Sequence, residues 1–567
     1  MGKRQASEGQ ALLDWTVMVY LAGDNNLTAE CIYALNEMKR ATVGDRIKII
    51  AQFDPQDDFL PTRRYEITHD SNPGGLITNN RGGAPFTDES PKARLRNKAR
   101  LEGLKAGKKA IADAAAQVLK EETSQTRPAV AFSLPVTNKI GDSIGQELLT
   151  GLEQLEDPAS PGAQETDTGS PSTLYNFLSF CVAKFPAKHY MVVLSGHGSG
   201  TERDYLLKDE SPAGYLTIQE LRRALEDLQH DLGGYRKIDI LGLDSCLMSM
   251  AEVCYELRNT ADILIGCESY SPASGWPYHE ILTCLRKETA KGEESLAERV
   301  AKGIVKEYVS FYTDYWLGGV SVDQSALDVG KVATLKIYID ELANMLNDIL
   351  ETDETRKQFA EVLVLTHWET QSYNGEQFVD LVDFCDCLSA RCSESSQIVE
   401  LCQKIRDFVT SPAEGGPFVL KSCFSGPAYQ YSHGVSIYFP WATVAPDYKE
   451  LSFVKDTRDS GWAKFLATYT QKTRRAPREI PLPSNLAGVE PFGFTDIASF
   501  NTSSPPQRFR KTQGMGPGNP IYSMRNPPLI ALPDECLGNK VRKNIVQGLI
   551  ALLAEEKERR QSNQSST

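Results

Sequence analysis

No stretch of this 567-residue chain approaches the 18 consecutive apolar residues of a membrane-spanning helix, and its polar first ten residues lack the apolar centre of a secretory signal. Basic residues are too few for the positive surface of a general nucleic-acid-binding protein, since 61 Lys and Arg stand against 75 Asp and Glu. The 12 cysteines are irregularly spaced, which is typical of reduced thiols in the cytosol. We therefore expect a cytoplasmic protein without membrane or nucleic-acid partners.

Several sequence patterns of known chemistry are missing as well. The sequence has no C-x-x-C pair and no H-E-x-x-H motif, so the usual zinc sites are not predicted. It has no calcium loop dense in Asp and Asn, no G-x-S-x-G elbow around Ser245, and no strand before the glycines at 514–518. We predict no metal site, and we interpret His279, His367 and His433 as structural residues.

Short apolar runs alternate with segments of helical spacing along much of the chain. The predicted strands are Trp15–Ala22, Arg46–Phe53, Tyr190–Leu194, Lys237–Leu243 and Ile263–Cys267. The predicted helices between them are Leu27–Arg40, Ser172–Lys184, Thr217–Leu228 and Leu247–Leu257. Strands that are apolar throughout and separated by helices are typical of a parallel sheet covered on both faces. The sequence therefore predicts an α/β fold with a mostly parallel central sheet.

Composition divides the chain into four parts. We predict an N-terminal tail at 1–13, a main α/β domain at 14–325 with an insert at about 80–170, a smaller α-rich domain at 326–475, and a tail at 476–567. The last part holds 11 of the 30 prolines and little periodicity before a terminal helix, so we predict that it is largely disordered. Within the insert, Lys92–Lys109 carries eight basic residues and one acid, and a solvated basic helix is its simplest interpretation.

Two predicted strands are followed by reactive side chains, His197 in a glycine-rich turn and Cys246 after Asp244 and Ser245. Active sites of parallel sheets form beyond the carboxyl ends of the strands, so neighbouring strands would bring this imidazole and thiol into one cleft. Such a pair suits acyl transfer, with the amides of Gly198 and Cys246 as donors to an oxyanion. The alternative is a buried structural cysteine, the commoner fate of a cysteine at a strand end.

The sequence resembles the clostripain family of cysteine peptidases. The segments that carry the resemblance are Trp15–Leu27 (WTVMVYLAGDNNL), His189–Gly200 (HYMVVLSGHGSG), Lys237–Leu257 (KIDILGLDSCLMSMAEVCYEL), Gly275–Tyr278 (GWPY), Val320–Asp328, Gly434–Pro440 and Tyr448–Tyr469. The resemblance implies a caspase-like α/β sandwich, with residues 14–325 as the catalytic domain. It also implies a thiol endopeptidase with a His/Cys dyad that cleaves after Arg, and sometimes Lys. Mapped by motif, the dyad is His197 and Cys246.

The resemblance also implies how a basic side chain is bound. Asp244 matches the acidic residue that the family carries two positions before its nucleophile, and a carboxylate can pair bidentately with a guanidinium. The structural alternative is an Asp that caps the helix after Cys246. Some relatives carry a second acid just before the GWPY stretch, where this chain has Ser274. We consider Glu268 as its substitute.

Self-processing and calcium are further expectations from the family. Relatives often cleave their own chain in the loop after the catalytic histidine, which makes Arg203 and Lys208 candidate cleavage sites here. The chemistry itself needs no cofactor. Some relatives depend on calcium, but no pattern in this sequence indicates its ligands. Two alternatives to an Arg-directed peptidase stay open at this stage, namely a caspase-fold peptidase with another specificity and a non-catalytic scaffold that uses its basic insert and tail to bind partners.

Overall fold

The computed structural model describes residues 12–55, 62–68, 153–155 and 166–473, apart from residue 26 and short gaps at 202–205, 211–212, 273, 314–320, 353–355, 374–376, 413–414, 442 and 457–460. The predictions for the Lys92–Lys109 segment, for Arg203 and for the C-terminal tail lie outside these residues, and so do residues 1–11 of the predicted N-terminal tail.

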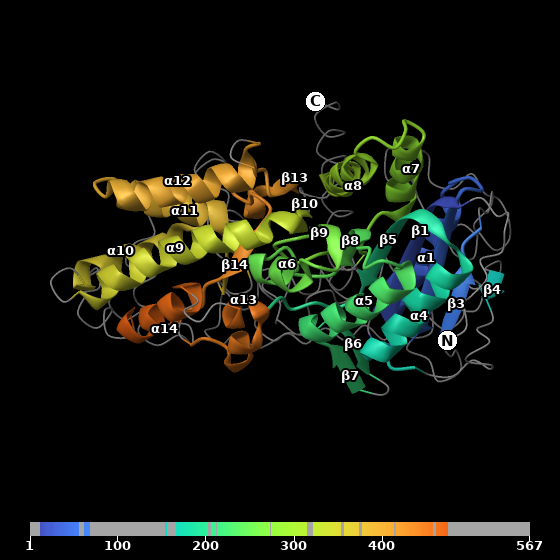
Figure 1. Ribbon diagram of the computed structural model, residues 1–567, viewed down its shortest axis with the longest axis horizontal. Coiled ribbons are helices and arrows are strands. Elements are labelled where there is room, and N and C mark those ends of the chain that lie inside the picture. The colour runs from blue at the N-terminus through green and yellow to red at the C-terminus, as the bar shows by residue number, and fades with distance from the viewer. Residues whose placement is uncertain are drawn as a thin grey trace, which may run out of the picture.

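A nine-stranded sheet forms the centre of the molecule (Figure 1). Its strands, in spatial order, are β13 (Val419–Ser425), β10 (Val322–Asp328), β9 (Ala261–Gly266), β8 (Ile238–Asp244), β5 (Ala187–Ser195), β1 (Leu13–Gly23), β2 (Ile47–Pro55), β3 (Arg63–Glu66) and β4 (Glu153–Leu155). The five strands from β9 to β2 are parallel to one another. On each side the sheet continues through two further strands, each of which pairs antiparallel with the strand before it. The predicted mostly parallel sheet is confirmed, and all five predicted strands belong to it.

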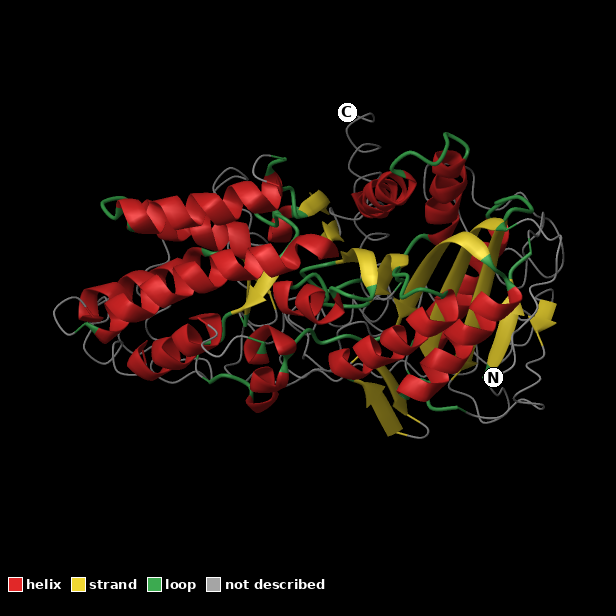
Figure 2. Cartoon of the chain, in the orientation of Figure 1, coloured by secondary structure: helices red, strands yellow, loops and turns green. Residues whose placement is uncertain are grey.

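Both faces of the sheet are buried because successive side chains of its inner strands enter two different cores. In β1, Met18 and Tyr20 pack into one core, whereas Val17 and Val19 pack into the other. The first core is covered by α4 (Pro171–Lys184), α5 (Ile218–Leu232) and α6 (Ala251–Leu257), and the second by α1 (Thr28–Arg40), α7 (Tyr278–Thr289) and α8 (Leu296–Tyr312). Figure 2 shows helices on both sides of the strands. This is the predicted α/β sandwich.

The C-terminal region is mostly helical, as predicted, and lies at one end of the molecule (Figure 1). Its helices are α9 (Val332–Glu351), α10 (Arg356–Glu369), α11 (Leu381–Arg391), α12 (Ser396–Thr410), α13 (Ser452–Lys455) and α14 (Gly461–Thr473). Short 3-10 turns occur at Val329–Lys331, Pro427–Tyr429 and Pro446–Glu450. A small antiparallel sheet consists of β11 (Ser372–Tyr373), β12 (Phe378–Asp380) and β14 (Ser436–Tyr438). None of the described helices is long and apolar enough to cross a membrane.

The boundary that we predicted near residue 325 runs through continuous structure. Strand β13 comes from the C-terminal region, yet it pairs with β10 as the outermost strand of the main sheet. One hydrophobic core also extends from Leu174 of α4 to Tyr469 of α14. The sequence missed β13 because this edge strand is only partly buried, and Lys421 and Ser422 interrupt its apolar residues so that neither a continuous apolar run nor a strict alternation remains.

The segment after Cys246 differs from its prediction. A helix was expected from Leu247, but α6 begins only at Ala251. Leu247 has a positive φ of 62°, and the amides of Leu247 and Ser249 donate to the carbonyls of Ser269 and Cys267. Pairing with the loop after β9 therefore replaces the first helical turn and holds Cys246 in a turn ahead of α6.

Candidate active site

The register of β5 and β8 places His197 and Cys246 at equivalent positions. The two strands are parallel neighbours, and their last aligned pair is Ser195 with Asp244. The Gly196 amide donates to the Asp244 carbonyl at 3.3 Å. His197 and Cys246 each follow two residues after that pair, so both lie at the carboxyl edge of the sheet, where parallel folds place their active sites.

The two loops that carry these side chains are in backbone contact. A Cβ atom at Gly198 would lie 2.8 Å from the Cys246 carbonyl oxygen and 3.0 Å from Ser245 Cβ, closer than real side chains approach. Glycine at this position therefore lets the histidine loop pack directly against the cysteine loop. That the amides of Gly198 and Cys246 donate hydrogen bonds to an oxyanion stays a prediction.

A pocket of about 440 Å³, its open mouth included, lies at this edge of the sheet. His197, Asp244 and Cys246 all line it, so the structure brings these three predicted residues together. The remaining lining includes Leu27, Glu30, Cys31 and Ala34 from the start of α1 and Ser271, Pro272, Ser274 and Gly275 from the loop after β9. The described lining residues include the carboxylates of Glu30 and Asp244 but no Lys or Arg.

The imidazole of His197 is uncharged in this pocket. Burial, assisted by the positive charge of Lys208, lowers the pKa of His197 to about 4, so its imidazole is neutral at physiological pH. Cys246 is 6% exposed, and its Sγ lies 3.9 Å from the Ser271 carbonyl oxygen. A neutral imidazole and a thiol in one pocket form the combination in which a base activates a nucleophile.

Asp244 is a buried carboxylate held by two hydroxyl groups. Ser195 Oγ donates to Asp244 Oδ2 at 2.9 Å, and Tyr278 Oη donates to the same oxygen at 3.1 Å. Burial raises the pKa of Asp244 to about 6, although these hydroxyls and the nearby Trp276 amide favour its charged form. The capping interpretation is not supported, because α6 begins at Ala251 and its N-cap residue Met250 makes no side-chain cap.

The Gly275–Tyr278 motif (GWPY) packs against the carboxyl ends of β5 and β8. A Cβ at Gly275, whose φ is 64°, would lie 2.7 Å from Asp244 Oδ2, so only glycine allows this close approach. The Trp276 ring lies on β8, where it would meet a Cβ at Gly242 at 2.5 Å. The motif therefore covers Asp244 and shapes the pocket beside it.

Comparison with known proteins identifies the family. The sequence profile described as the clostripain family matches residues 19–467, which is most of the chain. The chain belongs to the clostripain family. Clostripain from Hathewaya histolytica is 21% identical over an alignment of 335 positions, and the match covers 52% of this chain and 61% of that protein. This chain thus spans less than two thirds of the length of that relative.

Solved structures of similar proteins share little sequence with this clostripain-family chain. A secreted C11 cysteine protease from Bacteroides thetaiotaomicron, solved with an irreversible peptide inhibitor, is 16% identical with a TM-score of 0.46, over 80% of this chain and 99% of the other. An inactive zymogen C11 protease from Parabacteroides distasonis is 17% identical with a TM-score of 0.45, over 79% and 99%. The roles of individual residues in this clostripain-family chain therefore rest on its own geometry.

Glu268, the predicted substitute for a second pocket acid, is not among the lining residues. It is fully buried, and its Oε2 accepts from the Gly434 amide at 2.8 Å. Burial, together with the negative charges of Asp380 and Asp323, raises its pKa well above the usual range. The structure thus places Glu268 in a buried junction with the C-terminal region. The acid that does line the pocket beside Asp244 is Glu30 of α1, which the sequence analysis missed.

A signal for Glu30 was present in the sequence. The GDNNLTAE stretch directly follows β1, and β1 ends at the same edge of the sheet as β5. A residue in the first helical turn after that strand was therefore a reasonable candidate for the pocket wall.

The loop after His197 is held by several contacts. Its described part contains the hairpin of β6 (Leu206–Glu210) and β7 (Ala213–Leu216). The Leu207 amide donates to the His197 carbonyl at 2.9 Å, and Asn25 Nδ2 donates to the Lys208 carbonyl at 2.7 Å. The Lys208 side chain is about half exposed and lies 3.5 Å from Glu210.

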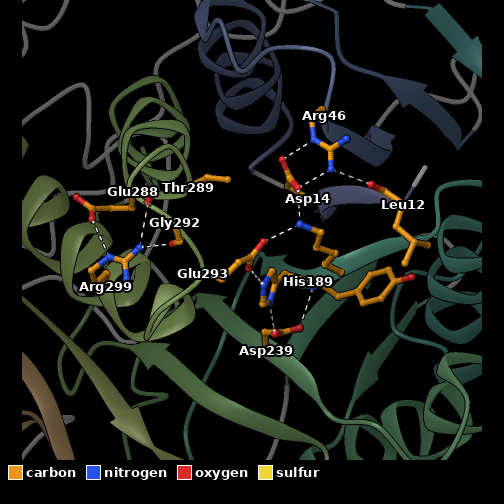
Figure 3. A network of polar contacts seen from close by, with 12 residues as sticks. Leu12, Asp14, Arg46, His189, Asp239, Glu288, Thr289, Gly292, Glu293 and Arg299 are labelled. Carbon is orange, nitrogen blue, oxygen red and sulfur yellow. Dashed lines mark hydrogen bonds and ion pairs between the residues drawn. The ribbon is translucent and has the colours of Figure 1, made fainter. Parts of the chain in front are cut away.

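His189 forms a polar network at the opposite edge of the sheet (Figure 3). Its Nδ1 lies 2.6 Å from Asp239 and its Nε2 lies 2.9 Å from Glu293, while Arg46 pairs with Asp14 nearby. These residues surround the amino ends of β1, β5 and β8, far along the strands from His197. This histidine with carboxylate partners is therefore a structural link between strands and the loop before α8.

The other histidines that we interpreted as structural do not line the pocket. His367 is buried and stacks on Phe439 and Trp441, and His433 Nδ1 lies 3.0 Å from Asp380. Within the described part of the chain, no group of three or more His, Cys, Asp or Glu is arranged to hold a metal ion.

Proposed function

We propose that this chain is a cysteine endopeptidase that hydrolyses peptide bonds after basic residues, Arg above all. The observation that carries the proposal is the convergence of His197, Cys246 and Asp244 on one pocket at the ends of β5 and β8. A base, a nucleophile and an acid for substrate recognition then come from two neighbouring strands.

In the proposed reaction the Cys246 thiol gives its proton to the neutral imidazole of His197, and the sulfur attacks the carbonyl carbon of the scissile bond. The amides of Gly198 and Cys246 stabilise the resulting oxyanion. The imidazolium then protonates the leaving amine as the C–N bond breaks, which leaves an acyl thioester. His197 finally takes a proton from a water molecule, whose oxygen attacks the thioester carbonyl carbon. The C–S bond then breaks, the acid product leaves, and the imidazolium returns its proton to the Cys246 thiolate.

The test compares reporter peptides with Arg, Lys or Asp before the scissile bond, using the wild type and the Cys246→Ala and His197→Ala variants. We expect cleavage of the Arg reporter, weaker cleavage of the Lys reporter, and loss of both in either variant. The matched control is Cys423→Ala, a half-buried cysteine on the outer strand β13. Turnover that survives Cys246→Ala would contradict the mechanism, and preference for the Asp reporter would contradict the specificity.

We also propose self-processing in the loop after His197, at Arg203 or Lys208. Cleavage after Lys208 requires its carbonyl to leave Asn25, since that hydrogen bond now holds β6 in place. Release of this contact would free the segment that pairs with the backbone of His197. A denaturing gel of the wild type and of Cys246→Ala tests the proposal, because a single intact chain in both cases would refute it.

A further inference from the structure

The pocket contains a second carboxylate that comes from a separate part of the fold. Glu30 lies in the first turn of α1, whereas Asp244 ends β8, and both line the pocket together with the dyad. Glu30 is 7% exposed and Asp244 is 4% exposed, so both acids lie in the wall of the pocket and not on the open surface.

The neighbouring residue Cys31 lies near both carboxylates. Cys31 also lines the pocket, and a Cβ at Gly23 would lie 3.2 Å from its Sγ. Burial is the main reason that the pKa of the Cys31 thiol is raised, and the negative charges of Glu30 and Asp244 raise it further. A cation in the pocket would therefore experience both acids.

The described wall of the pocket contains no Lys or Arg side chain. Asp244 Oδ1 is buried and accepts no hydrogen bond, although both hydroxyl contacts of this side chain reach Oδ2. A buried carboxylate oxygen without a donor costs free energy that an incoming cation would recover. This acceptor belongs to a residue in the wall of the pocket that the substrate occupies in the proposed reaction.

Ser274, where some relatives carry an acid, is engaged elsewhere. Its hydroxyl lies 2.7 Å from Tyr312 Oη, and the same tyrosine donates to the Gly275 carbonyl at 2.6 Å. Ser274 thus helps to fix the loop after β9 and supplies no charge. The negative charge absent at this position is present on the α1 side of the same pocket.

We propose that Glu30 is a specificity-determining residue, which together with Asp244 binds the guanidinium group of an arginine side chain in the substrate. This inference rests on the proposed peptidase function. A guanidinium carries five N–H donors in a planar fork and can engage two carboxylates from different directions, whereas an ammonium is a compact point charge. The two acids therefore favour Arg over Lys.

The experiment measures kcat/KM for peptidyl-Arg, peptidyl-Lys and peptidyl-citrulline reporters, because citrulline keeps the shape of arginine without its charge. In Glu30→Gln we expect the Arg-to-citrulline ratio to fall about 10- to 100-fold, the effect of losing one charged hydrogen bond in a buried site. The fall should appear mainly in KM, because Glu30 binds the side chain and not the reacting atoms.

Glu37→Gln is the matched control, since it removes the other α1 carboxylate, which pairs with Arg40 at 2.7 Å and does not line the pocket. It should leave the ratio unchanged. In the double variant Glu30→Gln with Ser274→Asp, the new acid should restore part of the preference for Arg. If Glu30→Gln fails to fold, Glu30→Asp provides the same test, because a shorter carboxylate should lower the Arg-to-Lys ratio.

The outcomes separate the two proposals. A wild-type protein that does not cleave the Arg reporter, or that cleaves it after Cys246→Ala, would overturn the proposed function. A wild-type protein that selects Arg, combined with an unchanged Arg-to-citrulline ratio in folded Glu30→Gln or an unchanged Arg-to-Lys ratio in Glu30→Asp, would overturn the role of Glu30 alone.

Discussion

The Ser195 hydroxyl donates a 2.9 Å hydrogen bond to Asp244, the residue aligned with it across β5 and β8. This contact joins the ends of the two strands that carry the proposed dyad. It also orients the proposed specificity acid, so the alignment of His197 with Cys246 and the position of Asp244 depend on the same pair of strands.

Gly198→Ala should lower activity strongly while the protein stays folded. The added Cβ would lie 2.8 Å from the Cys246 carbonyl oxygen, so the histidine and cysteine loops must move apart. Because a displacement of about 1 Å in a catalytic group can cost about 100-fold in rate, we expect a comparable loss of kcat on the Arg reporter. Gly330→Ala is the control, since its Cβ would meet only the Asp328 side chain, at 3.3 Å. An unchanged kcat in Gly198→Ala would show that the two loops need not be in contact.

The preference for Arg should depend on pH through Asp244. Its pKa is raised to about 6, so the carboxyl group is neutral below that pH and charged above it. The Arg-to-citrulline ratio of kcat/KM, which reports on the free enzyme, should therefore increase as the pH rises through about 6. The pKa of His197 is lowered to about 4, so its own titration lies below this range. In Asp244→Asn the ratio should be low and independent of pH, and a persistent rise in that variant would assign the titration to another group.

Glu268→Gln should stabilise the protein at alkaline pH. The folded state keeps a proton on Glu268 that the unfolded chain loses above its ordinary pKa, so stability falls as the pH rises from that value toward the raised one. Glutamine imitates the protonated form, and we expect a gain on the order of 1–2 kcal/mol in the free energy of unfolding at pH 8, which shrinks toward pH 5. Chemical denaturation of both proteins at the two pH values measures it, with the partly exposed Glu226→Gln as the control. A loss of stability at pH 8 would mean that Glu268 is charged in the folded protein.

Much of the site was predictable because it follows from local patterns. Apolar runs identified β5 and β8, and the polar residues that follow those runs identified His197 and Cys246. The GWPY motif was evident in the sequence, but its contact with Asp244 became clear only from the packing of Gly275 and Tyr278. Local sequence indicates where a strand ends, whereas side-chain contacts depend on segments that are distant along the chain.

The local sequence was enough to predict the α/β class, the segments that form the parallel strands and the reactive residues that follow them, because strand and helix periodicities are local properties. The tertiary structure alone decided that Glu30 lines the pocket and that Glu268 is buried elsewhere. It also decided that β13 extends the main sheet and that the helix after Cys246 begins only at Ala251. These outcomes follow from sheet register and long-range hydrogen bonds, which join residues far apart in the chain and leave no periodic trace in it.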